Sequence, residues 1–284
     1  MSFLSALTGS FSTPADDNPT VAMVEAAYAA AGLDARYVNV DVSSADLGDA
    51  VLGARAMGWV GFNCSMPHKV AVIDHLDGLG ESADLIGAVN CVVARDGSLI
   101  GENTDGRGFV EAMREVRHPA GTHVVVLGAG GAGRAIAVEA ALAGAARITV
   151  VNRNESRGQA LAVLVADRTP AEADFQPWTG PYAVPASADV VVNATSLGLG
   201  DAEAMVPVDP DTLRPDLLVA DVIPNPPRTA YLCEAERRGG ATLDGLGMLV
   251  AQGAVAIELW HGVSPDREVM RARLSEVLGL DSTP

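Results

Sequence analysis

The sequence is short of cysteine and of long apolar runs, and each shortage excludes a class of protein. Its three cysteines, Cys64, Cys91 and Cys233, are too scattered for a disulfide framework or a metal-ligand pattern. No apolar run reaches the roughly 18 residues of a membrane-spanning helix, and the first residues lack the basic stretch of a signal peptide. We therefore expect a protein of the reducing cytoplasm, with no metal ion and no membrane partner.

Basic residues are scarce as well. Lysine and arginine together number 19 against 36 aspartates and glutamates, which gives a formal net charge of −17 at pH 7. This balance argues against nucleic acid as a partner, and it means that an anionic ligand needs a local basic pocket. A chain of 284 residues that is 49% apolar suits one large or two ordinary domains.

The most informative stretch is 123–157, whose pattern predicts a strand, a glycine-rich turn, a helix and a second strand. Gly128, Gly130 and Gly133 have the G-x-G-x-x-G spacing, with Gly131 between them. Such glycines allow a tight turn, the approach of a pyrophosphate to the backbone, and close packing of helix on strand. The free N–H groups of the helix N-terminus then face the phosphates. We predict a dinucleotide site here; the alternative is a glycine-rich turn that only packs.

The end of the second strand indicates which dinucleotide binds. An NAD site usually has an acidic residue there that holds the ribose 2′-hydroxyl. This chain has Asn152 and Arg153 at that point and Arg157 shortly after, and guanidinium groups suit a 2′-phosphate. We predict NADP, with NAD possible because Glu155 could hold a 2′-hydroxyl instead.

The rest of the chain predicts an α/β protein of two domains. Residues 1–117 form an N-terminal α/β substrate domain that the C-terminal helices of 245–284 complete, and residues 118–244 form a Rossmann-type, doubly wound parallel sheet. The predicted elements of the first domain are strands at 3–7, 36–42, 59–65, 89–94 and 98–102, a loop at 9–19, helices from Pro19 and at 45–57 and 67–76, and a hairpin turn at Asp96–Gly97. In the second domain we expect 169–185 to be irregular.

Two charged residues of the first domain follow predicted strands. Lys69 comes after a strand and a proline-containing turn, and Asp105 comes after the hairpin. A lysine can protonate a carbonyl oxygen while a carboxylate orients it, so this pair suits carbonyl–alcohol chemistry. Each alone is more often a surface charge. We predict His68 at a helix surface and Cys64 as a buried small residue.

Several motifs resemble those of the shikimate dehydrogenases and follow one another in that family's order. They are NCSMPHK at 63–69, GAVN at 87–90, NTDG at 103–106, GAGGAGRA at 128–135, NATS at 193–196 and GLGMLVAQ at 245–252. The resemblance implies a two-domain enzyme of aromatic amino acid biosynthesis (the chorismate pathway). It also implies reversible hydride transfer between NADP and the 3-hydroxyl of shikimate.

The resemblance also implies roles for individual residues. Lys69 and Asp105 match the family's catalytic pair, and Asn90, Asp105 and Gln252 match residues that bind ring hydroxyls. Ser65 stands where the family has threonine. The matching cofactor positions are Gly128, Gly130, Gly131, Gly133, Asn152, Arg153, Arg157, Thr195, Ser196, Gly245 and Met248.

The N-terminal segment departs from the family pattern. The family's S-x-S-P motif opens the first helix, and its serines bind the substrate carboxylate. Here Pro19 follows Asp16, Asp17 and Asn18. Asn18 can still cap the helix and donate a hydrogen bond, whereas Asp16 would repel a carboxylate. The pair Ser10 and Ser12 is a rival S-x-S, so Asn18 and Ser12 are both candidate substrate ligands.

A second departure is at Pro224, which replaces the tyrosine of the family's D-x-x-Y-x-P segment. The hydride machinery thus resembles the family while the carboxylate end differs, so the expected substrate is shikimate or another cyclic polyol, quinate-like or without a carboxylate. Two alternatives stay open: a dinucleotide-binding protein with little turnover, and a methylene-tetrahydrofolate dehydrogenase. We expect a monomer or a homodimer.

Overall fold

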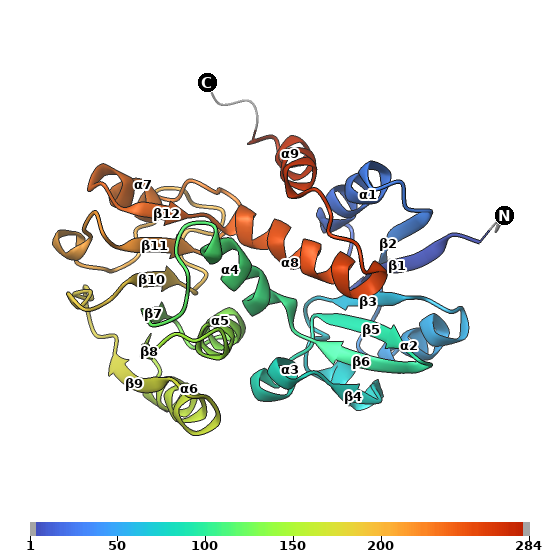
Figure 1. Ribbon diagram of the computed structural model, residues 1–284, viewed down its shortest axis with the longest axis horizontal. Helices are drawn as coiled ribbons and strands as arrows, with labels where there is room; N and C mark the ends of the chain where they lie inside the picture. Colours follow the sequence, from blue (N-terminus) through green and yellow to red (C-terminus); the bar gives the residue numbers. More distant parts are fainter. Residues whose placement is uncertain (1–3, 281–284) are drawn as a thin grey trace. The chain divides into compact units, whose positions relative to one another are not determined.

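The computed structural model describes residues 4–280, and they divide into two compact units (Figure 1). Unit 1 contains the residues up to Thr104 and those from Gln252 onward, and unit 2 is Asp105–Ala251. The sequence-based boundaries at 117 and 244 differ from these because α4 (Thr104–Arg114) packs on α5 (Gly131–Leu142). A Cβ at Gly106 would lie 2.3 Å from the Ala135 carbonyl oxygen, so the two helices touch backbone to backbone.

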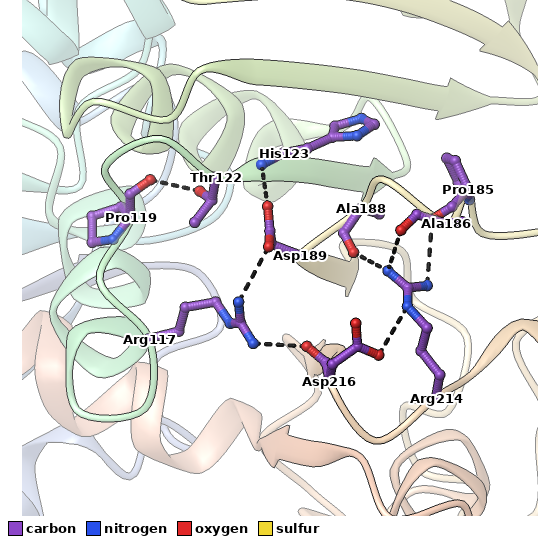
Figure 2. A network of polar contacts seen from close by, with 10 residues as sticks. All are labelled: Arg117, Pro119, Thr122, His123, Pro185, Ala186, Ala188, Asp189, Arg214 and Asp216. Carbon is purple, nitrogen blue, oxygen red and sulfur yellow. Dashed lines mark hydrogen bonds and ion pairs between the residues drawn. The ribbon is translucent and has the colours of Figure 1, made fainter.

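The contacts of the Arg117 side chain also place residue 117 in unit 2 (Figure 2). Its guanidinium pairs with Asp189 at 3.2 Å and donates to the Asp216 carbonyl at 2.7 Å. The other carboxylate oxygen of Asp189 accepts the His123 amide at 2.9 Å. The segment that leads into the first strand of unit 2 is therefore anchored to unit 2, and residue 117 lies inside that unit.

Unit 1 is built on a mixed sheet with the strand order β2-β1-β3-β5-β6-β4. β1 is parallel to β2 and β3, β5 is antiparallel to both of its neighbours, and β4 is parallel to β6. The hairpin predicted at Asp96–Gly97 is confirmed: both residues have positive φ, 51° and 83°, and connect β5 to β6. The strand bounds are β1 Ala6–Ser12, β2 Ala35–Asp41, β3 Gly61–Cys64, β4 Gly78–Leu79, β5 Cys91–Arg95 and β6 Ser98–Glu102.

The first strand differs from its prediction. Part of the expected strand at 3–7, Phe3, lies outside the described residues, and the expected loop from residue 9 is instead the buried second half of β1. Pairing with β2 and β3 on either side satisfies this segment's backbone despite its turn-forming residues. Gly9 suits that central position, because a Cβ there would lie 2.4 Å from the Val38 carbonyl and 2.8 Å from the Trp59 ring.

Helices α1 (Thr20–Ala30), α2 (Leu47–Ala56), α3 (Glu81–Ile86) and α9 (Arg267–Val277) belong to unit 1. α1 begins one residue after the predicted start, and Asn18 Oδ1 accepts the Thr20 amide at 3.1 Å. The predicted helix at 67–76 is only a 3-10 turn at Ala71–His75. At β2, an edge strand, the Tyr37 amide donates to the Glu25 carboxylate of α1 instead of to another strand.

Unit 2 has six parallel strands in the order β12-β11-β10-β7-β8-β9, which confirms the predicted α/β class with a doubly wound sheet. β7 and β10 are buried throughout, as expected for central strands. The expectation of an irregular 169–185 is wrong for its first part, because the exposed and half-buried residues Glu172–Pro177 pair with β8 as the edge strand β9. The bounds are β7 His123–Leu127, β8 Arg147–Asn152, β10 Val190–Asn193, β11 Leu218–Asp221, β12 Ala241–Leu243, α6 Glu155–Arg168 and α7 Ala230–Arg237. Helix α8 spans Gly245–His261 and contains the unit boundary.

Candidate functional site

The predicted substrate residues Asn90 and Gln252 come together in unit 1. Asn90 Oδ1 accepts the Thr104 amide at 2.6 Å, and its Nδ2 donates to Thr104 Oγ1 at 3.0 Å and to Gln252 Oε1 at 3.5 Å. Thr104 Oγ1 in turn donates to Gln252 Oε1 at 3.2 Å. The residue before β5, the start of α4 and the middle of α8 thus supply one cluster of buried, uncharged hydrogen-bonding groups. Such a cluster suits hydroxyl groups of a ligand.

Lys69 follows β3 in a turn that is bonded to the sheet. Its carbonyl accepts the Val89 amide at 2.7 Å, and the side chain is partly buried. Ser65, in the same turn, accepts the His68 amide at 2.8 Å through its carbonyl. Burial raises the pKa of the Cys64 thiol to about 12, while the Lys69 ammonium acts in the opposite direction. The ammonium therefore lies near the end of β3, and Cys64 is the buried residue that was predicted.

His68 is not the surface residue that the sequence predicted. Its side chain is 1% exposed, and Nε2 lies 2.8 Å from the Val42 carbonyl. The expectation is wrong because the segment is not an exposed helix but a turn packed under the end of β2. Since a carbonyl only accepts, Nε2 carries the proton, and His68 ties the turn that bears Lys69 to the residue after β2.

The N-terminal candidates lie along one face of β1. Asn18 Nδ2 donates to Ser10 Oγ at 3.2 Å, and the Asn18 carbonyl accepts from Asn39 Nδ2 at 2.9 Å. Ser12 is 3% exposed, and its Oγ has no partner among the described residues and is closed to solvent. Asp16 and Asp17, beside Asn18, are exposed. The structure therefore brings Asn18 and Ser10 together and leaves Ser12 shielded, so a role for Ser12 in substrate binding stays a prediction.

Asp105, the predicted partner of Lys69, is a partly buried residue in the first turn of α4. It belongs to unit 2, whereas Lys69 belongs to unit 1. Their pairing stays a prediction.

The glycine-rich turn has the geometry of a phosphate cradle. Gly128 has φ +108°, and a Cβ at Gly133 would lie 2.0 Å from the Gly128 carbonyl, so both positions require glycine. Gly130 and Gly131 are exposed, and a Cβ at either would meet nothing within 4 Å. α5 begins at Gly131 and turns its free N–H groups into this open space. The turn thus has room for a phosphate and the donors to bind it.

The residues after β8 support the same site. Asn152 Oδ1 accepts the Ala129 amide at 3.1 Å, which joins the end of β8 to the glycine-rich turn. Asn154 caps α6 by accepting the Arg157 amide at 2.9 Å, and the side chains of Arg153 and Arg157 are exposed. Arg153 also lines a cavity of about 230 Å³, whose other lining residues are Trp178, Thr179, Gly180, Thr195, Leu197 and Pro207.

A buried hydrogen-bond network supports the NATS segment. Asn193 Oδ1 accepts Thr195 Oγ1 at 2.7 Å, and Asn193 Nδ2 donates to the Leu197 carbonyl at 3.1 Å and to Asp221 at 2.9 Å. The other Asp221 oxygen accepts Thr229 Oγ1 at 2.8 Å. Burial raises the pKa of Asp221 to about 6 although these hydrogen bonds act in the opposite direction.

The remaining predicted cofactor residues lie in the same unit. A Cβ at Gly245 would be 2.4 Å from the Ile223 carbonyl, which explains glycine at the start of α8. Met248 is buried and Ser196 is exposed. Because β7 and β10 are the neighbours at which the strand order reverses, the turns after them form the usual ligand-binding edge of such a sheet.

Family models match most of this chain. The shikimate dehydrogenase substrate-binding domain matches residues 11–92, the shikimate/quinate 5-dehydrogenase model 111–199, and the shikimate 5′-dehydrogenase C-terminal domain 245–274. A shikimate dehydrogenase (NADP(+)) of Shouchella clausii is 40% identical over 260 residues, covering 90% of this chain and 93% of the relative. The chain belongs to the shikimate dehydrogenase family. It is accordingly an NAD(P)-dependent oxidoreductase.

Solved structures show how varied this family is. A ligand-free 5-ketofructose reductase of Gluconobacter sp. strain CHM43 is 58% identical, with a TM-score of 0.96, and the match covers 97% of this chain and 100% of that one. A quinate dehydrogenase of Corynebacterium glutamicum in complex with NAD is 35% identical, with a TM-score of 0.87 and coverage of 96% and 99%. Members of this family thus differ in substrate and in nicotinamide cofactor.

Sequence reasoning missed three polar residues of unit 1, namely Tyr37, Asn39 and Thr104. Tyr37 lies within a correctly predicted strand and is 2% exposed. A tyrosine at an inward position of a strand needs a hydrogen-bond partner, and this signal could have marked it.

Among the described residues, no group of three or more histidine, cysteine or acidic side chains has a geometry suited to a metal ion. No helix within 4–280 has the length and apolar character to cross a membrane.

Proposed function

We propose that this protein is an NADP-dependent reductase of a polyhydroxy ketone that carries no carboxylate, of the 5-ketofructose type. One observation carries the proposal: apart from the Lys69 ammonium, the hydrogen-bonded groups around the ends of β1, β3 and β5 are amides and hydroxyls, and the adjacent Asp16 and Asp17 are exposed acids. A neutral polyol can satisfy such groups, whereas a carboxylate beside two acids is repelled. The 58% identity to a 5-ketofructose reductase supports this substrate class.

The glycine-rich turn and the arginines after β8 fit NADP. Gly130 and Gly131 leave space for the pyrophosphate at the N-terminus of α5, and Arg153 and Arg157 offer exposed guanidinium groups to a 2′-phosphate. When bound, the cofactor supplies the hydride. The cavity beside Arg153 suits the adenosine end.

The chain's own residues would supply the proton and the orientation. Lys69, the sole lysine of the sequence, would give a proton to the carbonyl oxygen as it gains charge, and Asp105 would orient that oxygen and the ammonium. Asn90 and Gln252 would bind hydroxyls and hold the substrate in position.

A shikimate or quinate dehydrogenase is the second candidate. The family models and the retained Lys69, Asp105, Asn90 and Gln252 favour it. In that case Ser10 or Asn18 would have to hold the carboxylate with neutral hydrogen bonds.

Initial rates of NADPH oxidation with 5-ketofructose, 3-dehydroshikimate and 3-dehydroquinate, side by side, test the proposal. We expect kcat/KM for 5-ketofructose to exceed the others by at least about tenfold, since one unfavourable charge contact costs more than a neutral hydrogen bond. A preference for 3-dehydroshikimate or 3-dehydroquinate would establish the second candidate. NADPH binding measured by calorimetry without turnover on any ketone would indicate a dinucleotide-binding protein instead.

A further inference from the structure

Tyr37 is a buried tyrosine of β2 that no sequence motif marks. Its side chain is 2% exposed, and its hydroxyl donates to Asn63 Oδ1 at 2.8 Å. Ser10 of the adjacent strand β1 lies close enough to this hydroxyl to lower the pKa of the phenol, but burial is the larger effect and raises it. The hydroxyl therefore stays protonated at physiological pH and can donate to Asn63.

Each partner of Tyr37 leads to a predicted substrate ligand. Asn63 Nδ2 donates to the Asn90 carbonyl at 2.9 Å, next to the side chain that holds Thr104 and Gln252. On the other side, Ser10 Oγ accepts from Asn18 Nδ2 at 3.2 Å. The Tyr37 hydroxyl thus lies between two sets of amides that include the predicted substrate ligands Asn18 and Asn90.

Strand pairing holds the backbones of these residues but leaves the amide groups free to rotate. Ser10 is paired with Asn39 on one side and with Asn63 on the other, so the polar side chains form a row across three strands. Without the hydroxyl, Asn63 Oδ1 would lose its donor and its amide could turn over. The Asn90 carbonyl would then lose one of its two donors, the other being the Cys64 amide at 2.9 Å.

We propose that Tyr37 is a positioning residue, which orients Asn63 and Ser10 and through them Asn90 and Asn18 for the hydroxyls of a neutral polyol. The proposal rests on the proposed function for its substrate class. Tyr37 acts through these neighbours, because its own side chain is too buried to touch a ligand.

The substitution Tyr37→Phe removes only the hydroxyl, and Tyr28→Phe is a matched control. Tyr28 is 1% exposed in the same unit, and its hydroxyl lies 2.8 Å from Thr8 Oγ1 and 3.2 Å from His261 Nε2, away from the predicted ligands. We expect Tyr37→Phe to raise KM for 5-ketofructose about tenfold, with kcat within about twofold and KM for NADPH unchanged. Tyr28→Phe should lower the melting temperature to a similar degree and leave KM unchanged. Equal KM values in the two variants would overturn the proposal.

A second measurement separates this proposal from the choice of substrate. The side-chain amide signals of Asn63 and Asn90 in nitrogen-15 spectra, recorded without substrate, should shift in Tyr37→Phe and not in Tyr28→Phe. If the wild-type protein reduces no ketone but these signals shift as expected, the proposed function fails and the positioning role stands. If the signals stay in place in Tyr37→Phe, Tyr37 does not orient these amides.

Discussion

The polar network of unit 1 is made of uncharged groups, whereas that of unit 2 contains a buried carboxylate. In unit 1 the hydrogen-bonded row from Asn18 to Gln252 consists of amides and hydroxyls, with Lys69 on the neighbouring turn. In unit 2 a buried carboxylate, Asp221, lies at the centre of the network, and two exposed arginines, Arg153 and Arg157, come after β8. A neutral network discriminates hydroxyl groups and changes little with pH, whereas a buried acid makes its surroundings depend on pH.

The largest expected effect is that of removing the Lys69 ammonium, which lies beside the unit 1 network. Lys69→Ala should lower kcat by about 10² to 10⁴, the usual contribution of a positioned proton donor, and leave NADPH affinity unchanged. Arg95→Ala removes an exposed charge of the same unit, from β5, and should leave kcat unchanged. A kcat within about threefold of wild type for Lys69→Ala would remove Lys69 from the reaction.

Because Lys69 is the sole lysine, reductive methylation with carbon-13 formaldehyde labels it together with the terminal amine. Its titration can then be followed directly in the absence of substrate. A rate profile that falls as this amine loses its proton would agree with a proton donor.

The second prediction concerns the buried acid of unit 2. Between the ordinary pKa of 3.8 and the raised value of about 6, folded Asp221 binds more protons than unfolded Asp221, so its contribution to stability is lost as pH rises. Asp221→Asn should therefore gain stability over wild type as pH increases from about 4 to about 7. The gain should reach about 3 kcal/mol and stay constant above that range. Urea unfolding of both proteins across this range measures the difference.

For Asp77 of unit 1 the pKa is lowered instead of raised, so the expected pH dependence of stability has the opposite sign. Hydrogen bonding by the Leu99 amide and by Arg55 lowers its pKa. The Asp77→Asn variant should thus lose stability relative to wild type at neutral pH and recover it as pH falls below the ordinary range. If the Asp221 and Asp77 variants followed the same pH trend, one of the two pKa directions would be wrong.

The smallest effect concerns the exposed charges of unit 2. Arg153→Ala should weaken NADPH binding by about tenfold or more and leave NADH binding unchanged, because only NADPH carries the 2′-phosphate. Arg168→Ala, at the other end of α6, is the control with the same loss of charge. Equal losses for NADPH and NADH would place Arg153 away from the 2′-phosphate. Fluorescence titration with both cofactors measures this.

Short sequence patterns, which depend only on residues close together in the chain, predicted many of the turns and strands. The glycine spacing at 128–133 and the Asp96–Gly97 turn specify backbone conformations that other residues cannot adopt, and both occur where expected. The central strands of unit 2, β7 and β10, are buried on both faces and read as apolar runs, which is a local signal as well.

The errors arose where distant segments decide the structure. Ser10 and Ser12 have turn-forming side chains, and only pairing with β2 and β3 makes their segment a strand. His68 is buried because the residue after β2 offers its carbonyl. The role of Tyr37 depends on three strands that meet from separate parts of the chain, so no short motif could reveal it.

The Glu25 carboxylate, on the outer side of β2, affects association between molecules of this protein through that edge strand. An unpaired amide on an edge strand is where a strand from another molecule can add and begin an aggregate. Here the Tyr37 amide already has a charged acceptor. An incoming strand would have to displace that carboxylate or bury its charge. The Glu25 side chain therefore disfavours strand addition, and so aggregation, at this edge.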